Sequence, residues 1–239
     1  KARSTMTEPL VLRTDIATAD GAGLTTLTLN RPDKLNALGP TMFIELREHL
    51  DAIAGDESVG CVVLTGAGRA FCAGHDLGSI ASGERAPSRH FEPETVDALE
   101  ALPQPTIARI HGHCYTGGLE LALACDLLIA SESAKLGDTH GQWGLAPIWG
   151  MSIRLPERIG RSAAKELMFT SRRITGAEAA GVASGVAIGV ATGAATGTAA
   201  AGGGGAGGER GRGRRGEGSG VKGTGKGTGK GRAWRRGLT

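Results

Sequence analysis

The sequence has few cysteines and no long apolar run. Its four cysteines lie far apart and include no C-x-x-C pair, which favours neither a disulfide framework nor a zinc site. Three of them lie inside apolar runs, where cysteine behaves as a small hydrophobic side chain. No stretch is long and apolar enough to span a bilayer, and residues 1–10 lack the apolar segment of a signal peptide. We therefore expect a cytoplasmic protein without a membrane partner.

Large side chains are almost absent from residues 181–239. This segment holds 22 of the 41 glycines and carries ten Lys/Arg against two Glu, a local charge of +8. Residues 1–180 carry 17 basic and 22 acidic residues, a charge of −5. So few large apolar side chains bury too little area to offset the entropy of ordering the chain. We predict a flexible N-terminus at 1–8, a globular core at 9–180 and a low-complexity, disordered tail at 181–239.

The excess of positive charge in the tail suggests binding to nucleic acid or another anionic surface. However, the segment has no aromatic residue before Trp234 and cannot stack a series of bases. We expect only salt-sensitive, nonspecific adhesion and no dedicated nucleic-acid partner. A Gly/Ala/Arg-rich composition also arises when GC-rich DNA is read in a shifted frame, a hypothesis that sequencing of the coding region tests.

Strand and helix patterns alternate along the core, and residues 81–93 have the composition of a surface loop. The order of strand, loop, helix and strand indicates an α/β fold with covered sheets. Strands are predicted at 9–16, 23–29, 60–66, 105–110 and 127–131; helices are predicted from Pro40 through Ile53, at 94–101, after Gly117 and Gly118, and near 149–158, 161–170 and 176–180.

Two glycine-bearing loops each follow a predicted strand. The first, AFCAGHDL, covers residues 70–77, and the second, GHCYTGGLELALACD, covers 112–126. Gly117 and Gly118 stand where a helix begins, so unpaired N–H groups and the positive end of the helix dipole point outward together. Two backbone donors beside a carboxylate can form an oxyanion hole. A thioester enolate needs such a hole, because charge builds on the carbonyl oxygen when the α-carbon exchanges a proton.

Four longer sequence motifs follow one another along the chain: TLTLNRPDKLNAL, VVLTGAGRAFCAGHDL, GGLELALACDLLIAS and LPERIGRSAAKELMFTSRRITGAEAA. They resemble the enoyl-CoA hydratase/isomerase (crotonase) family over about residues 10–180. The resemblance implies an α/β spiral of β-β-α repeats, a homotrimer or hexamer, an acyl-CoA substrate, and no further cofactor or metal. Residues 181–239 do not match, whereas the family continues with a strand and helices that close the acyl pocket and form the trimer.

The resemblance also places functional residues on this chain. The two N–H donors of the oxyanion hole fall on His75 and Gly117, and the first catalytic glutamate falls on Glu120. The second catalytic glutamate would occupy position 140, where this chain has His140. The expected positions for binding substrate and CoA are Lys34, Ala73, His75, Asp76, Leu77, Gly78 and Gly118.

The histidine at position 140 bears on the reaction. Hydration needs one group that activates water and another that protonates the α-carbon, and a side chain with a pKa of about 6.5 can do either. Asp138 would supply a second carboxylate only after a local rearrangement, which the spacing does not support. We expect an enoyl-CoA hydratase/isomerase of fatty acid metabolism that acts through Glu120 and His140. The alternatives are another reaction of the family (isomerase, thioesterase, dehalogenase or decarboxylase) and an impaired acyl-CoA-binding protein without the C-terminal helices.

Two further pairs of residues leave a choice of interpretation. Trp143 and Trp149 either line the acyl pocket or pack in the core. His111 and His113 suggest a metal site, but the sequence supplies no third ligand at a usable spacing, so we predict none.

Overall fold

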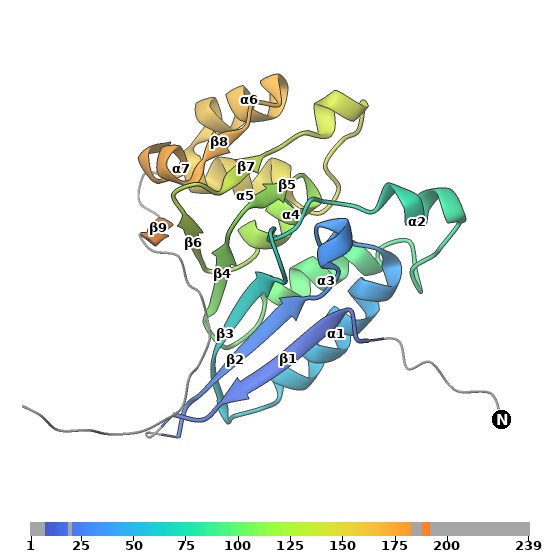
Figure 1. The fold of residues 1–239 in the computed structure, drawn as a ribbon, viewed down its shortest axis with the longest axis vertical. Coiled ribbons are helices and arrows are strands. Elements are labelled where there is room, and N and C mark those ends of the chain that lie inside the picture. The colour runs from blue at the N-terminus through green and yellow to red at the C-terminus, as the bar shows by residue number, and fades with distance from the viewer. Residues whose placement is uncertain (1–7, 19–20, 183–187, 192–239) are drawn as a thin grey trace, which may run out of the picture. The chain divides into compact units, whose positions relative to one another are not determined.

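The computed structural model describes residues 8–18, 21–182 and 188–191. All of them belong to the first of the chain's two units, Lys1–Ala195. Within these residues, the larger sheet has the strand order β1-β2-β3-β4-β6-β9 (Figure 1). β1 is antiparallel to β2, and every later pair is parallel. The strands are Val11–Ile16, Gly23–Leu29, Val59–Gly66, Thr106–Ile110, Leu127–Ser131 and Ile188–Ala191.

A smaller sheet aligns the two strands that precede the Glu120 and His140 segments. It consists of β5 (His113–Tyr115), β7 (Lys135–Gly137) and β8 (Ile174–Thr175). β5 and β7 are parallel, with Tyr115 opposite Gly137. The carboxyl ends of these two strands are therefore level with each other, so the segments that follow them begin side by side.

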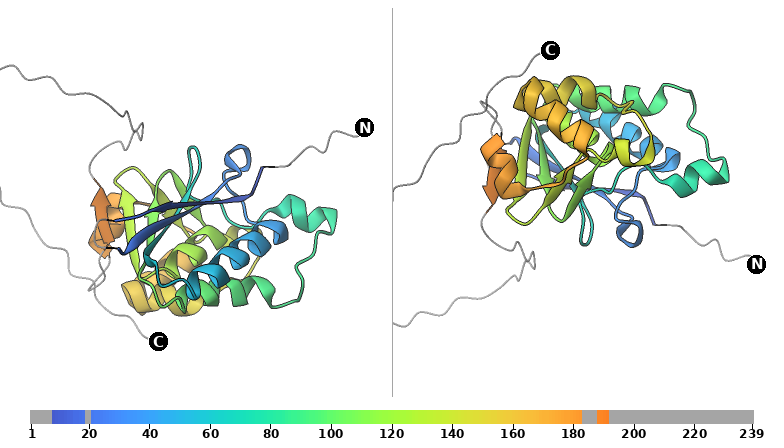
Figure 2. Two further views of the ribbon diagram at one scale, coloured as in Figure 1. Left: turned by 90° about the horizontal axis from the view of Figure 1, so that it is seen from below. Right: turned by 90° about the horizontal axis from the view of Figure 1, so that it is seen from above.

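Helix α1 (Pro40–Ala54) covers the larger sheet with its apolar face. It begins with proline at its first position, where the missing N–H has no helical partner to lose. Its predicted core residues Phe43, Leu46, Leu50 and Ile53 are all buried, because their spacing of three and four places them on one side of the helix. Figure 2 shows α1 beside α3 (Phe91–Glu100) on the same face of the sheet.

Helix α4 (Gly117–Leu123) lies inside the molecule, and all of its residues are buried, including Glu120. A helix whose residues are all buried belongs to the core, so the carboxylate of Glu120 is held in the interior of the molecule. None of the helices in the described ranges is long and apolar enough to cross a membrane. The remaining helices are α2 (Leu77–Ser82), α5 (Met151–Ile159), α6 (Arg161–Thr170), α7 (Gly176–Val182) and the 3₁₀ turns η1 (Pro32–Lys34) and η2 (His140–Trp143).

The structure corrects the sequence-based prediction in four places. Helix α2 lies where a loop was expected, and α3 begins three residues earlier than predicted. The strands β5, β7 and β8 were missed, because two or three residues are too few to show a period. Strand β9 pairs with β6 inside the segment that we predicted to be disordered, so that prediction is wrong for Ile188–Ala191. Most of the predicted tail, and residues 1–7 of the predicted flexible N-terminus, lie outside the described residues.

Three of the four cysteines pack in the core, whereas Cys61, which lies in an apolar run, is only partly buried. Cys72, Cys114 and Cys125 are buried free thiols. Burial raises the pKa of Cys72 and of Cys125 to about 12, and a thiol is a poor nucleophile until it loses its proton. These side chains therefore contribute packing rather than reactivity.

Candidate active site

The two glycine-bearing loops lie directly against each other. The N–H of Cys72 donates to the carbonyl of His113 at 3.0 Å, and the N–H of Tyr115 donates back to the carbonyl of Cys72 at 3.0 Å. The first loop is held on its other side by Leu38, whose N–H donates to Gly74 and whose carbonyl accepts from Asp76. Hydrogen bonds on both sides therefore fix the backbone of residues 72–76.

Glycine is needed where the loops make their closest approach. Gly74 has a φ of +109°, and a Cβ built there would lie 2.5 Å from Oγ1 of Thr116. A Cβ on Gly118 would lie 2.4 Å from the carbonyl oxygen of Cys72. Neither position has room for a side chain, so both glycines allow the first loop to pack on the start of α4.

Replacement of Gly118 by alanine is expected to lower the free energy of unfolding by about 1–3 kcal/mol, because the added methyl group forces the two loops apart. Gly55→Ala is the matched control, since a Cβ there meets nothing within 4 Å and should change stability by less than about 0.5 kcal/mol. Urea unfolding of both variants makes the comparison. Equal unfolding free energies would show that the loops do not constrain each other.

Several backbone N–H groups at this junction have no acceptor among the described residues, and two of them, on His75 and Gly117, border the same space. The Leu38 bridge uses the carbonyl of Gly74 and the N–H of Asp76, which leaves the N–H of His75 between them without an acceptor in the described part of the chain. Gly117 is the first residue of α4, and its N–H also finds no acceptor among the described residues. Both residues line one cavity of about 460 Å³, a volume in the range of small-molecule sites. The predicted pair of donors therefore borders a common space.

The cavity has an apolar wall and a polar end. Trp149 lies in the apolar wall, with its ring centroid 5.0 Å from that of His75 and 4.8 Å from that of Phe43. Its ring also occupies the space where a side chain of Gly117 would lie. Both interpretations of Trp149 therefore hold, because it lines the cavity and packs on the core. The other lining residues are Ala73, Leu77, Tyr115, Thr116, Glu120, Thr139, His140, Gln142, Trp143, Leu145, Ala146, Ile148 and Arg173.

Glu120 presents one free carboxylate oxygen to this cavity. Its Oε1 accepts the N–H groups of Trp149 at 2.8 Å and of Met151 at 3.1 Å. Its Oε2 is buried and has no hydrogen-bond partner in the part of the chain that the structure describes. The residue is 1% exposed, and burial raises the pKa of Glu120 above its ordinary value against the effects of those hydrogen bonds and of His140. A carboxyl group with a raised pKa keeps its proton to a higher pH than an exposed one does.

His140 lies between two carboxylates. Its Nε2 is 3.6 Å from Oε2 of Glu120, and its Nδ1 is 2.6 Å from Oδ1 of Asp138. Burial alone would lower the pKa of His140, but the hydrogen bond and charge of Asp138 and the charge of Glu120 raise it above its ordinary value. Asp138 contacts His140 but is not among the residues that line the cavity, so it does not supply a second carboxylate to the cavity in this structure.

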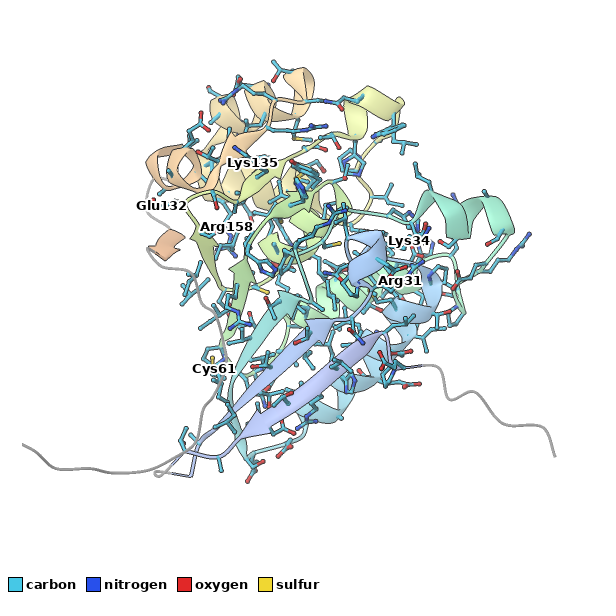
Figure 3. All side chains as sticks on the ribbon, in the orientation of Figure 1. Arg31, Lys34, Cys61, Glu132, Lys135 and Arg158 are labelled. Carbon is cyan, nitrogen blue, oxygen red and sulfur yellow. The ribbon has the colours of Figure 1, made fainter. Side chains whose placement is uncertain are left out.

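The other predicted binding residues divide into two groups. Ala73 and Leu77 line the cavity together with His75. Lys34, Asp76, Gly78 and Gly118 lie outside its lining: Lys34 is exposed at the end of η1, close to Arg31 (Figure 3), and Asp76 pairs with Arg31 at 2.8 Å. Gly78 donates to Asp76, and Gly118 packs on Cys72.

The structure also adds lining residues that the sequence analysis did not predict. Arg173, whose guanidinium lies 5.0 Å from the ring centroid of Tyr115, and Gln142 belong to the polar end of the cavity. Trp143 lines the cavity, which agrees with the first of its two interpretations, although most of its side chain is exposed. His111 and His113 contact Gly68 and Tyr115, and the described residues contain no group of three or more His, Cys, Asp and Glu that could hold a metal ion.

Comparison with known proteins relates this chain to one family. The family model for enoyl-CoA hydratase/isomerase matches residues 19–190, ten residues beyond the limit of the resemblance that we predicted. A probable peroxisomal enoyl-CoA hydratase of Arabidopsis thaliana is 41% identical over 68% of this chain and 61% of its own length. A putative enoyl-CoA hydratase/isomerase of Bacillus subtilis is 45% identical over 64% of this chain and 60% of its own length. The chain thus spans about three fifths of these relatives.

The solved structures agree with the sequence relatives. An enoyl-CoA hydratase from Bacillus anthracis has a TM-score of 0.67 and 40% identity, covering 73% of this chain and 67% of that chain. One from Mycobacterium tuberculosis has a TM-score of 0.62 and 38% identity, covering 73% and 72%. The relatives' names include peroxisomal and mitochondrial proteins, so a cytoplasmic location stays a prediction. The predicted crotonase-type α/β fold is confirmed, and the chain belongs to the enoyl-CoA hydratase/isomerase family.

Proposed function

We propose that this protein binds an acyl-CoA thioester and adds water to the double bond of a 2-enoyl-CoA. One observation carries the proposal: the unpaired N–H groups of His75 and Gly117 border the same cavity as the buried carboxyl group of Glu120 and the imidazole of His140. The thioester oxygen would accept both N–H groups. Each donor would contribute about 2.7–4 kcal/mol as negative charge develops on that oxygen.

The two side chains would divide the proton transfers. Nε2 of neutral His140 takes a proton from water while the water oxygen bonds to the β-carbon, and the electrons of the double bond move onto the thioester oxygen. Protonated Glu120 then gives its proton from Oε2 to the α-carbon, which collapses the enolate. A proton passes from His140 to Glu120 across the 3.6 Å between them and restores the starting state. The net change is the addition of one water molecule.

A second candidate is the isomerisation of a 3-enoyl-CoA to the 2-enoyl isomer. Among the described lining residues, Glu120 is the one carboxylate of the cavity, and this reaction needs a single base that moves a proton between two carbons. His140→Gln distinguishes the two reactions, because it removes the water-activating base and leaves Glu120 in place. Loss of hydration with isomerisation retained assigns the water-activating role to His140.

Turnover of crotonyl-CoA, followed by the loss of the enoyl absorbance, tests the main proposal. We expect hydration that saturates with substrate. A chain that binds crotonyl-CoA without hydrating it would be either the isomerase or the impaired acyl-CoA-binding protein, and turnover of a 3-enoyl-CoA distinguishes these two. A chain that fails to bind crotonyl-CoA would contradict the proposal altogether. We also propose that the protein assembles as a homotrimer or hexamer and that it divides into a core at 9–180 and a low-complexity tail.

A further inference from the structure

Asp138 holds His140 through two hydrogen bonds to a single oxygen. Its Oδ1 accepts from Nδ1 of the imidazole at 2.6 Å and from the backbone N–H of His140 at 3.0 Å. Asp138 is 2% exposed and follows directly after β7. The last residue of β7, Gly137, accepts the N–H of Thr116 at 3.0 Å, which ties the Asp138 segment to the residue that precedes α4. The helix that carries Glu120 and the loop that carries Asp138 are therefore fixed to each other.

This contact sets the tautomer of His140. An ionised carboxylate only accepts hydrogen bonds, so Nδ1 must carry the hydrogen in the contact with Asp138. In the neutral ring, Nε2 is then the nitrogen with a free lone pair, and it is the nitrogen that faces Oε2 of Glu120 at 3.6 Å. The imidazole is thus placed with its accepting side toward the cavity.

We propose that Asp138 is a positioning residue that orients His140, so that Asp138, His140 and Glu120 act as one carboxylate–imidazole–carboxylate chain in the hydration of a 2-enoyl-CoA. This inference rests on the proposed function. A purely structural role would need only the bond to the backbone N–H, a common local turn contact for aspartate. The bond to Nδ1 adds nothing to that turn, but it fixes which ring nitrogen can accept a proton.

The three linked groups, Asp138, His140 and Glu120, predict how the activity depends on pH. Its active form holds one proton between Glu120 and His140; a second proton inactivates it at low pH, and loss of the first inactivates it at high pH. The negative charge of Asp138 favours protonation of the pair, so its removal should move both limbs of the profile to lower pH. Other titratable or charged groups in the cavity wall are His75, Tyr115 and Arg173. Arg154 donates to the carbonyl of Trp149 behind Glu120, and Asp97 and Glu100 pair with it.

Asp138→Asn in the full-length chain tests the inference. We expect kcat for crotonyl-CoA to fall by at least about 10²-fold, since general-base catalysis is typically worth 10²–10⁴-fold, while KM changes by less than about threefold. The pH profile of the residual activity should move to lower pH. Asp51→Asn is the matched control, because its side chain is 62% exposed on α1. Unchanged kcat and an unchanged profile in Asp138→Asn, with an active wild type, would overturn the inference and leave the proposed function standing.

In a variant with a carboxylate at position 140, Asp138→Asn should no longer lower kcat. In His140→Glu, the side chain at position 140 is a carboxylate that Asp138 would repel rather than orient. Adding Asp138→Asn to this variant should raise kcat or leave it unchanged, whereas a structural role would lower it again. A further loss of activity in the double variant would therefore contradict the positioning role.

The ring itself gives a readout that needs no turnover. ¹⁵N NMR of histidine-labelled protein should show His140 in the Nδ1–H tautomer, and this tautomer should lose its dominance in Asp138→Asn. An Nε2–H tautomer in the wild-type protein would overturn the inference even if crotonyl-CoA proves not to be a substrate. Crotonyl-CoA turnover thus tests the proposed function, and the tautomer of His140 tests this inference separately.

Discussion

Replacement of Glu120 by glutamine is expected to lower kcat for the hydration of crotonyl-CoA by about 10³-fold, within the range of general acid–base catalysis. The amide oxygen of glutamine can still accept the N–H groups of Trp149 and Met151 that Oε1 accepts now. The other end of the amide can neither give a proton to the α-carbon nor receive one from His140. The chemistry should therefore fail while the local structure persists.

The stability of this variant provides an internal check. Burial raises the pKa of Glu120, so in the folded protein its ionisation is disfavoured, and the stability that this residue contributes is largest below its unfolded pKa and falls as pH rises toward the folded value. A neutral glutamine escapes that loss, and the unfolding free energy of Glu120→Gln at neutral pH should be no lower than that of the wild type. Glu94→Gln, at an exposed position on α3, is the matched control. Retention of more than about a tenth of wild-type kcat would exclude Glu120 as the main acid–base group.

The largest loss of stability is expected for Phe43→Ala, at about 3–5 kcal/mol. Phe43 is fully buried on α1, and its ring makes an edge-to-face contact with Trp149, a geometry that adds about 0.5–1.5 kcal/mol beyond burial alone. Removal of the ring leaves a cavity under the wall of the proposed acyl site. Because Trp149 also donates its backbone N–H to Glu120, kcat should fall together with stability.

Phe169→Ala is the matched control for this prediction. It removes the same ring from α6, where the side chain is 79% exposed, and should change the free energy of unfolding by no more than about 0.5 kcal/mol. Urea unfolding of both variants, with an activity assay on the folded protein, makes the comparison. A loss below about 1 kcal/mol in Phe43→Ala would contradict the packing of α1 against Trp149.

The sequence was informative where local pattern decides structure. Strands and helices of five or more residues were predicted with few errors, because the positions of Phe43 and Leu46 on one helix face, for example, follow from spacing alone. The short strands β5 and β7 could not be predicted, since they exist through their pairing with each other and not through their own pattern. β9 was missed for a related reason: the Gly- and Ala-rich sequence around its four residues indicates flexibility, and the strand depends on pairing with β6.

The candidate site shows the same division. The positions of His75, Gly117 and Glu120 could be carried over from motifs, because each lies inside a long matching run. The contact of Asp138 with His140 could not be predicted, because it depends on the turn after β7. Arg173 and Tyr115 are 58 residues apart and meet only in the folded chain, so neither residue carries a local signal for the cavity. Lys34 was predicted from a motif as a CoA contact and lies outside the lining of this cavity, so its contact with CoA stays a prediction.

A crystal structure of the full chain with an unreactive acyl-CoA thioester analogue tests the central claim most directly. The thioester oxygen should lie about 2.7–3.1 Å from the backbone nitrogens of both His75 and Gly117, with the α-carbon facing Oε2 of Glu120. An analogue bound with this oxygen turned away from either nitrogen, or bound outside this cavity, would contradict the account.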